Sequence, residues 1–193
     1  MRYEDMEYLN FKNIIDSIDE LDNPTRALIA KKLELSRTTV SNVVNVLIEK
    51  EIAIETEVEK TKRGRPGLKL GFTSDKWFAL GAAFTTDSWT FVIVDLNGKI
   101  CDKYTTPSVS LFTPESIIST LLAGLRFMIC RVKGYLLPSI GLGLPGIVDS
   151  ERGEILFAND LGWHNPINVS EIVEKELGYK VYCINRYTTS GLA

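Results

Sequence analysis

The spacing of apolar residues changes character at residue 50 and again near residue 74. Up to residue 50 they recur every three or four positions, which predicts helices over 3–18, 25–33 and 36–50. The third helix has the clearest buried face, made of Val40, Val43, Val44, Leu47 and Ile48. Beyond it apolar and polar residues alternate, which predicts a strand over 52–59 and a returning strand over 68–70.

A different pattern begins after a turn at residues 74–76, so we expect one domain at 1–73 and a second at 74–193. In the second domain, apolar runs predict five strands and helical spacing predicts two helices. The expected strands are 78–84, 90–94, 100–106, 139–144 and 181–184, and the expected helices are 114–133 and 169–177. The chain is therefore predicted to join a small α+β domain to an α/β domain.

The polar side of the helix at 36–50 carries the first candidate chemistry. It has short polar side chains and one arginine, Ser36 can cap its first turn, and its only acidic residue is Glu49 at the far end. A solvated helix face more often pairs acidic with basic residues, whereas this one can approach base edges and phosphates without repelling them. The residues expected to contact DNA here are Arg37, Thr38, Thr39, Ser41 and Asn42.

The helix at 25–33 is expected to be its packing partner, through Ala27, Leu28, Ile29 and Leu33. Thr25 can cap it, and Thr25 and Arg26 are also expected to contact DNA. The turn at 34–35 lacks the glycine often found at such a corner, so a strained backbone is expected at Glu34. Two helices joined in this way predict a helix-turn-helix, whose second helix enters the major groove. The alternative is a small helical hairpin that serves only packing.

A basic, glycine-containing and proline-containing segment lies between the two predicted strands of the first domain. Residues 60–69 include Lys60, Lys62, Arg63, Arg65 and Lys69 and no acidic residue. Next to a helix-turn-helix this segment predicts a wing, with Arg65 in an A·T-rich minor groove and Lys62 and Arg63 on phosphates. A solvated hairpin turn with incidental charge is the alternative.

Composition narrows the classes of protein. The 193 residues are 45% apolar with a mean hydropathy of +0.02 and a net charge of −3, so any nucleic-acid site must be a local basic patch. No apolar run is long enough to cross a membrane and the N-terminus is no signal peptide, so a cytoplasmic protein is expected. Cys101, Cys130 and Cys183 suit buried thiols, and with one histidine, His164, no zinc site is expected.

Several motifs together resemble the N-terminal part of the ROK-family transcriptional repressors. They are LSRTTVS at 35–41, GRP at 64–66, GLGLPGIVD at 141–149, LGW at 161–163 and YCIN at 182–185. The resemblance implies a winged helix-turn-helix followed by a ribonuclease-H-like lobe of the actin and sugar-kinase type. That lobe would be incomplete, because the zinc motif and second lobe of the family would follow residue 193.

The resemblance also implies partners. Double-stranded DNA, a second copy of the chain and a sugar effector are expected, and no membrane. Gly146, Asp160 and Asn185 match family positions near the sugar, although a structural role in their loops is favoured over ligand binding.

Two departures from the family's kinases bear on catalysis. Ala83 replaces the aspartate of the first hairpin, and threonines replace the glycines of the phosphate loop at 85–86. Arg186 follows Asn185 where kinases have the aspartate that acts as general base, and an arginine cannot accept a proton. We therefore expect no catalytic residue, no cofactor and no enzyme activity.

The function predicted from the sequence is a sequence-specific, non-catalytic transcriptional regulator that represses carbohydrate-use genes. A degenerate ROK-type module that dimerises or binds another protein is the alternative. A sugar kinase is a weaker one.

Overall fold

The structure is a computed structural model that describes residues 3–57 and 68–186. The chain forms two compact units, residues 1–76 and 77–193. The boundary between them lies three residues beyond the one predicted from the sequence, after residue 73. Each unit has its own hydrophobic core. None of the helices in the described part is long and apolar enough to span a membrane.

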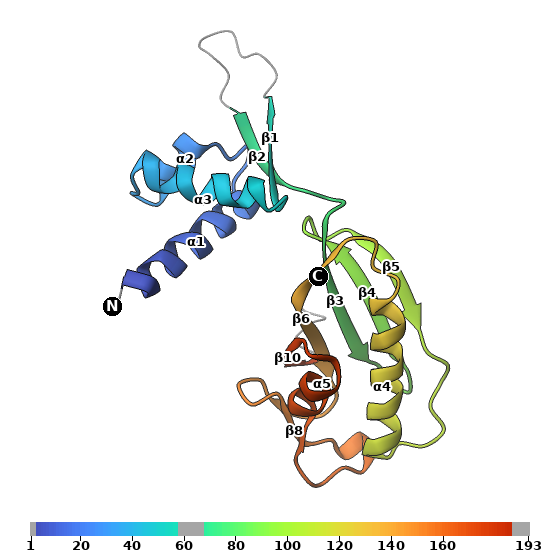
Figure 1. Ribbon diagram of the computed structural model, residues 1–193. Helices are drawn as coiled ribbons and strands as arrows, with labels where there is room; N and C mark the ends of the chain where they lie inside the picture. The colour runs from blue at the N-terminus through green and yellow to red at the C-terminus, as the bar shows by residue number, and fades with distance from the viewer. Residues whose placement is uncertain (1–2, 58–67, 187–193) are drawn as a thin grey trace. The chain divides into compact units, whose positions relative to one another are not determined.

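The N-terminal unit packs three helices against a two-stranded antiparallel sheet (Figure 1). The elements are α1 (Tyr3–Glu20), α2 (Arg26–Lys32), α3 (Arg37–Glu49), β1 (Ala53–Glu57) and β2 (Leu68–Phe72). Ala53 pairs with Phe72 and Glu57 with Leu68. The buried residues of this unit's hydrophobic core are Ile14, Ile18, Ile29, Ala30, Val40, Val44, Leu47, Ala53 and Leu70.

Side-chain caps and one strained residue set the path from α2 to α3. The Thr25 hydroxyl accepts from the Leu28 amide, and the Ser36 hydroxyl accepts from the Thr39 amide. Glu34 has a φ of 56°, which confirms the expected strain at this corner. The predicted packing face of α2 was wrong in part: Ile29 is buried as expected, but Ala27 and Leu28 are exposed, and Ala30 is buried although it was not predicted to pack.

The C-terminal unit contains a five-stranded sheet in the order β10-β6-β3-β4-β5. Strands β3 to β5 are antiparallel neighbours, and β6 and β10 are added parallel to β3. Both long helices, α4 (Pro114–Ile129) and α5 (Val169–Leu177), cover one face of the sheet (Figure 1). The strands are β3 (Trp77–Phe84), β4 (Trp89–Asp95), β5 (Ile100–Thr105), β6 (Tyr135–Leu144) and β10 (Lys180–Asn185).

A second, three-stranded sheet was not predicted. It consists of β7 (Ile147–Asp149), β8 (Glu154–Phe157) and β9 (Ile167–Asn168), and a short 3-10 helix, Asn159–Leu161, follows β8. These strands are too short to show the alternation by which a strand is recognised in a sequence. They matter because they place Asp160 near the end of β10.

Three other expectations need correction. The helix predicted over 114–133 ends at Ile129, and β6 begins at Tyr135 instead of residue 139. Cys101 and Cys130 are exposed and only Cys183 is buried, so the prediction of three buried thiols was wrong. The first two lie on the edge strand β5 and at the end of α4, where one side of the chain faces solvent.

Candidate nucleic-acid interface

The outward face of α3 consists of uncharged polar side chains. Thr38, Asn42 and Asn45 are exposed and succeed one another at spacings of four and three residues, so they share one side of the helix. Val40, Val44 and Leu47 on the opposite side are fully buried. The helix therefore has one face fixed in the core and one face available to a partner.

The other predicted α3 contacts differ in exposure. Arg37 is exposed at the first turn, whereas Thr39 and Ser41 are half-buried. The Thr39 hydroxyl lies 2.8 Å from the Ser36 hydroxyl and belongs to the cap of α3. Its role in the described structure is therefore to fix the start of the helix.

Thr25 and Arg26 have partners within the N-terminal unit. Thr25 caps α2, and Arg26 joins α2 to two other elements. The Arg26 Nε donates to Glu55 Oε1 of β1 at 2.7 Å, and its Nη1 donates to Asn45 Oδ1 of α3 at 2.7 Å. The same Nη1 lies 3.3 Å from the Ser41 carbonyl oxygen, which accepts from it.

The DNA contacts of the predicted wing remain a prediction. Lys62, Arg63 and Arg65 lie outside the described residues, although the strands that flank them, β1 and β2, pair as expected.

A groove of about 500 Å³ between α1 and α3 was not predicted. Its lining includes Asn42, together with Met6 and Val46, which are 45% and 37% exposed. The sequence signal for this groove is Val46 itself, an apolar residue on the otherwise polar side of the helix.

A second candidate site lies where the parallel strands of the C-terminal unit end. The Asn185 amide nitrogen donates to the Gly146 carbonyl oxygen, which joins β10 to the turn after β6. Gly146 has a φ of 77°, and a Cβ there would overlap the carbonyl oxygen of Phe157. Both residues thus have structural roles here, and the sugar contacts expected of them remain a prediction.

Arg186 lies beside this turn. Its Nη1 donates to the carbonyl oxygens of Phe84, at 3.4 Å, and Thr85, where β3 ends. Its Nη2 lies 3.4 Å from Asp160 Oδ2, so the third residue predicted to contact a sugar is engaged by an arginine. A guanidinium stays protonated, so it cannot accept the proton of a sugar hydroxyl.

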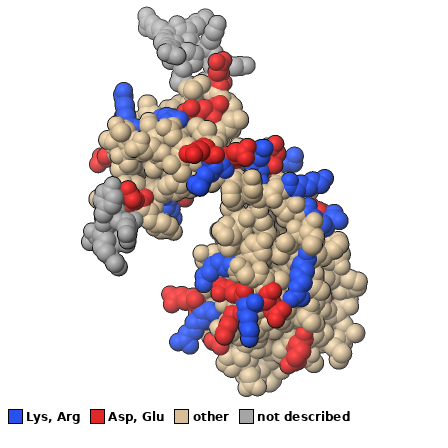
Figure 2. All heavy atoms as spheres, viewed as in Figure 1, with Lys and Arg blue, Asp and Glu red and all other residues tan. Residues whose placement is uncertain are grey.

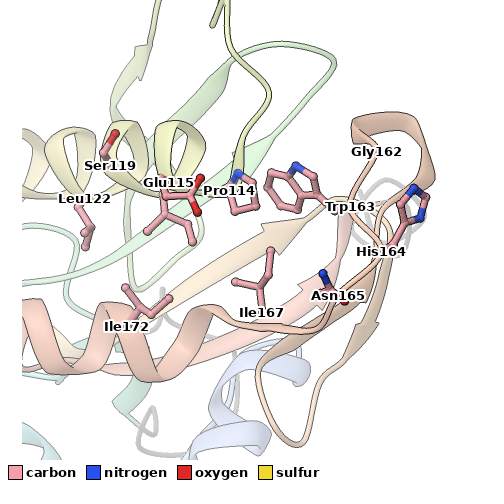
Figure 3. Close-up of a pocket in the computed structure, with 11 residues that line it drawn as sticks. Pro114, Glu115, Ser119, Leu122, Gly162, Trp163, His164, Asn165, Ile167 and Ile172 are labelled. Atoms are coloured by element: carbon pink, nitrogen blue, oxygen red, sulfur yellow. The ribbon is translucent and has the colours of Figure 1, made fainter.

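A further groove, of about 700 Å³, lies between α4, α5 and the loop after the 3-10 helix (Figure 3). Ile118, Leu122, Ile167 and Ile172 make it largely apolar, and His164 lies exposed at its rim. Figure 2 shows that charged side chains of this unit gather over α5, whereas few lie over α4, whose only charged residues are Glu115 and Arg126.

The perturbed pKa values belong to residues other than the candidate contacts named above. Burial, and then the charge of Glu174, raise the pKa of the Cys183 thiol to about 12. Hydrogen bonds from the Val181 amide and from Lys180 lower the pKa of Glu174, and the guanidinium of Arg131 lowers that of Asp102. Among the described residues no group of His, Cys, Asp or Glu side chains could hold a metal ion.

Comparison with known proteins assigns the chain to a family. The sequence model of the ROK family matches residues 82–192, more than half of the chain. The protein belongs to the ROK family.

Its curated relatives include repressors. A xylose repressor of Caldicellulosiruptor bescii is 27% identical over 179 residues, which cover 89% of this chain and 44% of the relative. The DNA-binding transcriptional dual regulator NagC of Escherichia coli is 23% identical over 190 residues, which cover 97% and 46%. The chain thus spans less than half the length of these relatives.

Solved structures support the fold. A ROK-family transcriptional regulator, a homologue of the Escherichia coli Mlc protein, superimposes with a TM-score of 0.74 at 21% identity. That match covers 93% of this chain and 46% of the other. An inorganic polyphosphate/ATP-glucomannokinase from Arthrobacter matches with a TM-score of 0.53 at 21% identity, over 61% of this chain and 47% of the kinase. The sheet is therefore of the type found in this sugar kinase.

Proposed function

We propose that this protein is a sequence-specific DNA-binding regulator that represses carbohydrate-use genes and has no catalytic activity. In this proposal the N-terminal unit is a winged helix-turn-helix, with α3 in the major groove. The observation that carries it is the face of α3 formed by Thr38, Asn42 and Asn45, which is polar, exposed and free of acidic side chains. Such side chains hydrogen-bond to base edges without repelling phosphates.

The extent of the similarity supports this function over a kinase. The alignment with NagC covers 97% of the chain and so includes the N-terminal unit, whereas the glucomannokinase match covers 61%. The relatives include a xylose repressor and an N-acetylglucosamine repressor, which supports sugar genes as the targets.

The contacts of Arg186 support the absence of phosphoryl transfer. Its guanidinium binds carbonyl oxygens at the end of β3 and pairs with Asp160, so a permanent positive charge lies beside Asn185. Arg186 stands where the family's kinases have the aspartate that activates the sugar hydroxyl, and Ala83 replaces the separate aspartate of the first hairpin. A coupled assay with ATP and a set of hexoses should detect no turnover, and measurable turnover would disprove this part.

The C-terminal unit is proposed to dimerise and to sense a sugar. A dimer would place two copies of α3 on two half-sites, which multiplies affinity. The sugar effector would lie near Gly146, Asp160 and Asn185, the family positions named above. Isothermal titration calorimetry with xylose and N-acetylglucosamine tests the effector, and sedimentation tests the dimer.

The first experiment is selection of binding sites from a randomised duplex pool at near-physiological salt. We expect an inverted repeat with A·T-rich flanks. Asn42→Ala should lower affinity for the selected site by about tenfold. Asn165→Ala, which removes an asparagine that is also exposed but lies in the C-terminal unit, should leave affinity unchanged.

The wing is tested with the same selected site. Arg65→Ala should weaken binding most on A·T-rich flanks. Equal loss on every duplex would instead leave Arg65 as a phosphate contact.

Binding without sequence preference that disappears as salt rises would contradict the proposal, because phosphate attraction alone behaves in this way. That result would favour the alternative function, a ROK-type module that dimerises or binds another protein.

A further inference from the structure

One arginine connects three elements beneath the outward face of α3. Arg26, from α2, donates to Glu55 of β1 and to Asn45 of α3, both at 2.7 Å. The side chains of Arg26 and Glu55 are 27% and 20% exposed, so the connection lies partly beneath the surface. Asn45 is exposed and belongs to the same face as Thr38 and Asn42.

The chemistry of arginine fixes the orientation of the Asn45 amide. A guanidinium has only donors, so the atom of Asn45 that faces Arg26 must be its oxygen, Oδ1. The amide nitrogen, Nδ2, is then the end left for a partner, and among the described residues it makes no hydrogen bond of its own. A free asparagine offers a donor and an acceptor, which suits the N7 and N6 atoms of adenine. Asn45 instead presents a donor.

We propose that Asn45 reads a guanine in the major groove and that Arg26 is the positioning residue that makes it do so. Guanine shows two acceptors there, N7 and O6, and no donor, and it is the base that best fits an amide nitrogen. Cytosine shows only its N4 donor and is rejected. This inference rests on the proposed function, since it assumes that α3 enters the major groove.

The same contacts argue against Arg26 as a phosphate contact. Its Nε and Nη1 are already engaged by Glu55 and by α3. A phosphate approaching Arg26 would also meet the negative charge of Glu55, which lies against the guanidinium. Lys31, exposed in the last turn of α2, is a basic residue without such a partner among the described residues.

The test measures binding of the full chain to the selected site and to its single-base variants, over a range of salt concentrations. Asn45→Ala and Arg26→Met should each lower the preference for guanine by about tenfold at one and the same base pair. The double variant should lose no more than Asn45→Ala alone, because the two residues act through one contact. Lys31→Met removes the same charge from the same helix and should weaken binding to all duplexes alike.

Three results would overturn the inference and leave the proposed function intact. Arg26→Met could weaken all duplexes equally and reduce the salt slope by about one, as loss of a phosphate contact does. Asn45→Ala, a change at an exposed position, could leave every base preference in place. The base pair that depends on Asn45 could prefer a base other than guanine. A wild-type chain without any sequence preference would instead overturn the proposed function together with the inference.

Discussion

Each unit contains an arginine that connects three segments of the chain, and the two arginines have opposite effects on the candidate site beside them. The side chain of Arg26 is 27% exposed and binds one carboxylate, one backbone carbonyl and the side chain of Asn45. The side chain of Arg186 is 19% exposed and binds two backbone carbonyls and the carboxylate of Asp160. The first arginine leaves a neighbouring amide pointing outward, whereas the second engages a residue that was expected to bind a ligand.

The difference shows that the partners of a half-buried arginine decide its effect on a site. A backbone carbonyl offers only an acceptor and has no second polar end that an arginine could orient. An arginine that binds backbone carbonyls therefore stabilises a loop and adds positive charge there. A side-chain amide has two ends, so an arginine that binds one end orients the other. The contacts of Arg186 accordingly constrain the C-terminal site, whereas those of Arg26 orient the amide of Asn45 on the exposed face of α3.

The turn after β6 should be the most sensitive position in the C-terminal site. Gly146→Ala places a side chain on a residue with a φ of 77° and 2.7 Å from the Cα of Ala158. The left-handed backbone and the overlap together should cost about 3 kcal/mol of unfolding free energy. All three tryptophans, Trp77, Trp89 and Trp163, lie in the C-terminal unit, so urea unfolding followed by tryptophan fluorescence measures this loss directly.

Gly98→Ala is the matched control for that substitution. Gly98 also has a φ of 77°, but a Cβ there would meet nothing within 4 Å. It should cost about 1 kcal/mol, the strain alone. Equal losses at the two positions would mean that the turn at Gly146 moves aside and that the C-terminal site is less constrained than its contacts indicate.

Arg186→Met should have the next largest effect. It removes charged hydrogen bonds to the carbonyl oxygens of Phe84 and Thr85 and should destabilise the C-terminal unit by about 2 kcal/mol. Arg152→Met is the control, since that side chain is 75% exposed and its pair with Asp149 spans 3.8 Å; its loss should stay under about 0.5 kcal/mol. Similar unfolding curves for the two variants would show that Arg186 does not hold the loops together.

The Arg26 cluster should be less costly to disrupt. Glu55→Ala removes one charged partner and leaves the bond between Arg26 and Asn45, so we expect a loss of about 1 kcal/mol. Hydrogen exchange of the α2 and α3 amides measures it, because the N-terminal unit has no tryptophan. Glu20→Ala, which removes the 64% exposed partner of Lys32, should leave those exchange rates unchanged. A larger loss than that of Arg186→Met would reverse the proposed contrast.

The sequence predicted the parts of these clusters that depend on neighbouring residues. Thr25 and Ser36 cap helices as expected, because a cap needs only the amide three residues later. Glu34 is strained as expected, because a two-residue corner without glycine requires a positive φ.

The partners of the two arginines could not be predicted in this way. Glu55 lies 29 positions from Arg26, and Phe84 lies 102 positions from Arg186, so only the folded chain brings them together. The short strands β7 to β9 were missed for a related reason. Each is too short to show a period, and pairing with its neighbours defines it.

The smallest effect at neutral pH concerns Cys183, which lies in β10 two residues before Asn185. Its thiol is 2% exposed, and its pKa is raised from 9.0 to about 12 by burial and by Glu174. At mildly alkaline pH a thiol reagent should therefore label Cys101 and Cys130, which are exposed, and label Cys183 only after unfolding. Mass spectrometry of the labelled chain identifies each site.

The same shift predicts how stability depends on pH. Because the folded chain holds the Cys183 proton more tightly than the unfolded chain, its contribution to stability is complete below pH 9.0 and is lost as the pH rises toward about 12. Cys183→Ser should remove most of that dependence, whereas Cys130→Ser should leave it in place. Cys183 lies opposite Leu142 where β10 pairs with β6. We expect this pairing to keep β10 in the sheet without Arg186, so Arg186→Met should not speed labelling of Cys183. Rapid labelling in that variant would instead show that Arg186 holds the strand as well as the loops, and would extend its role beyond the site at the ends of the strands.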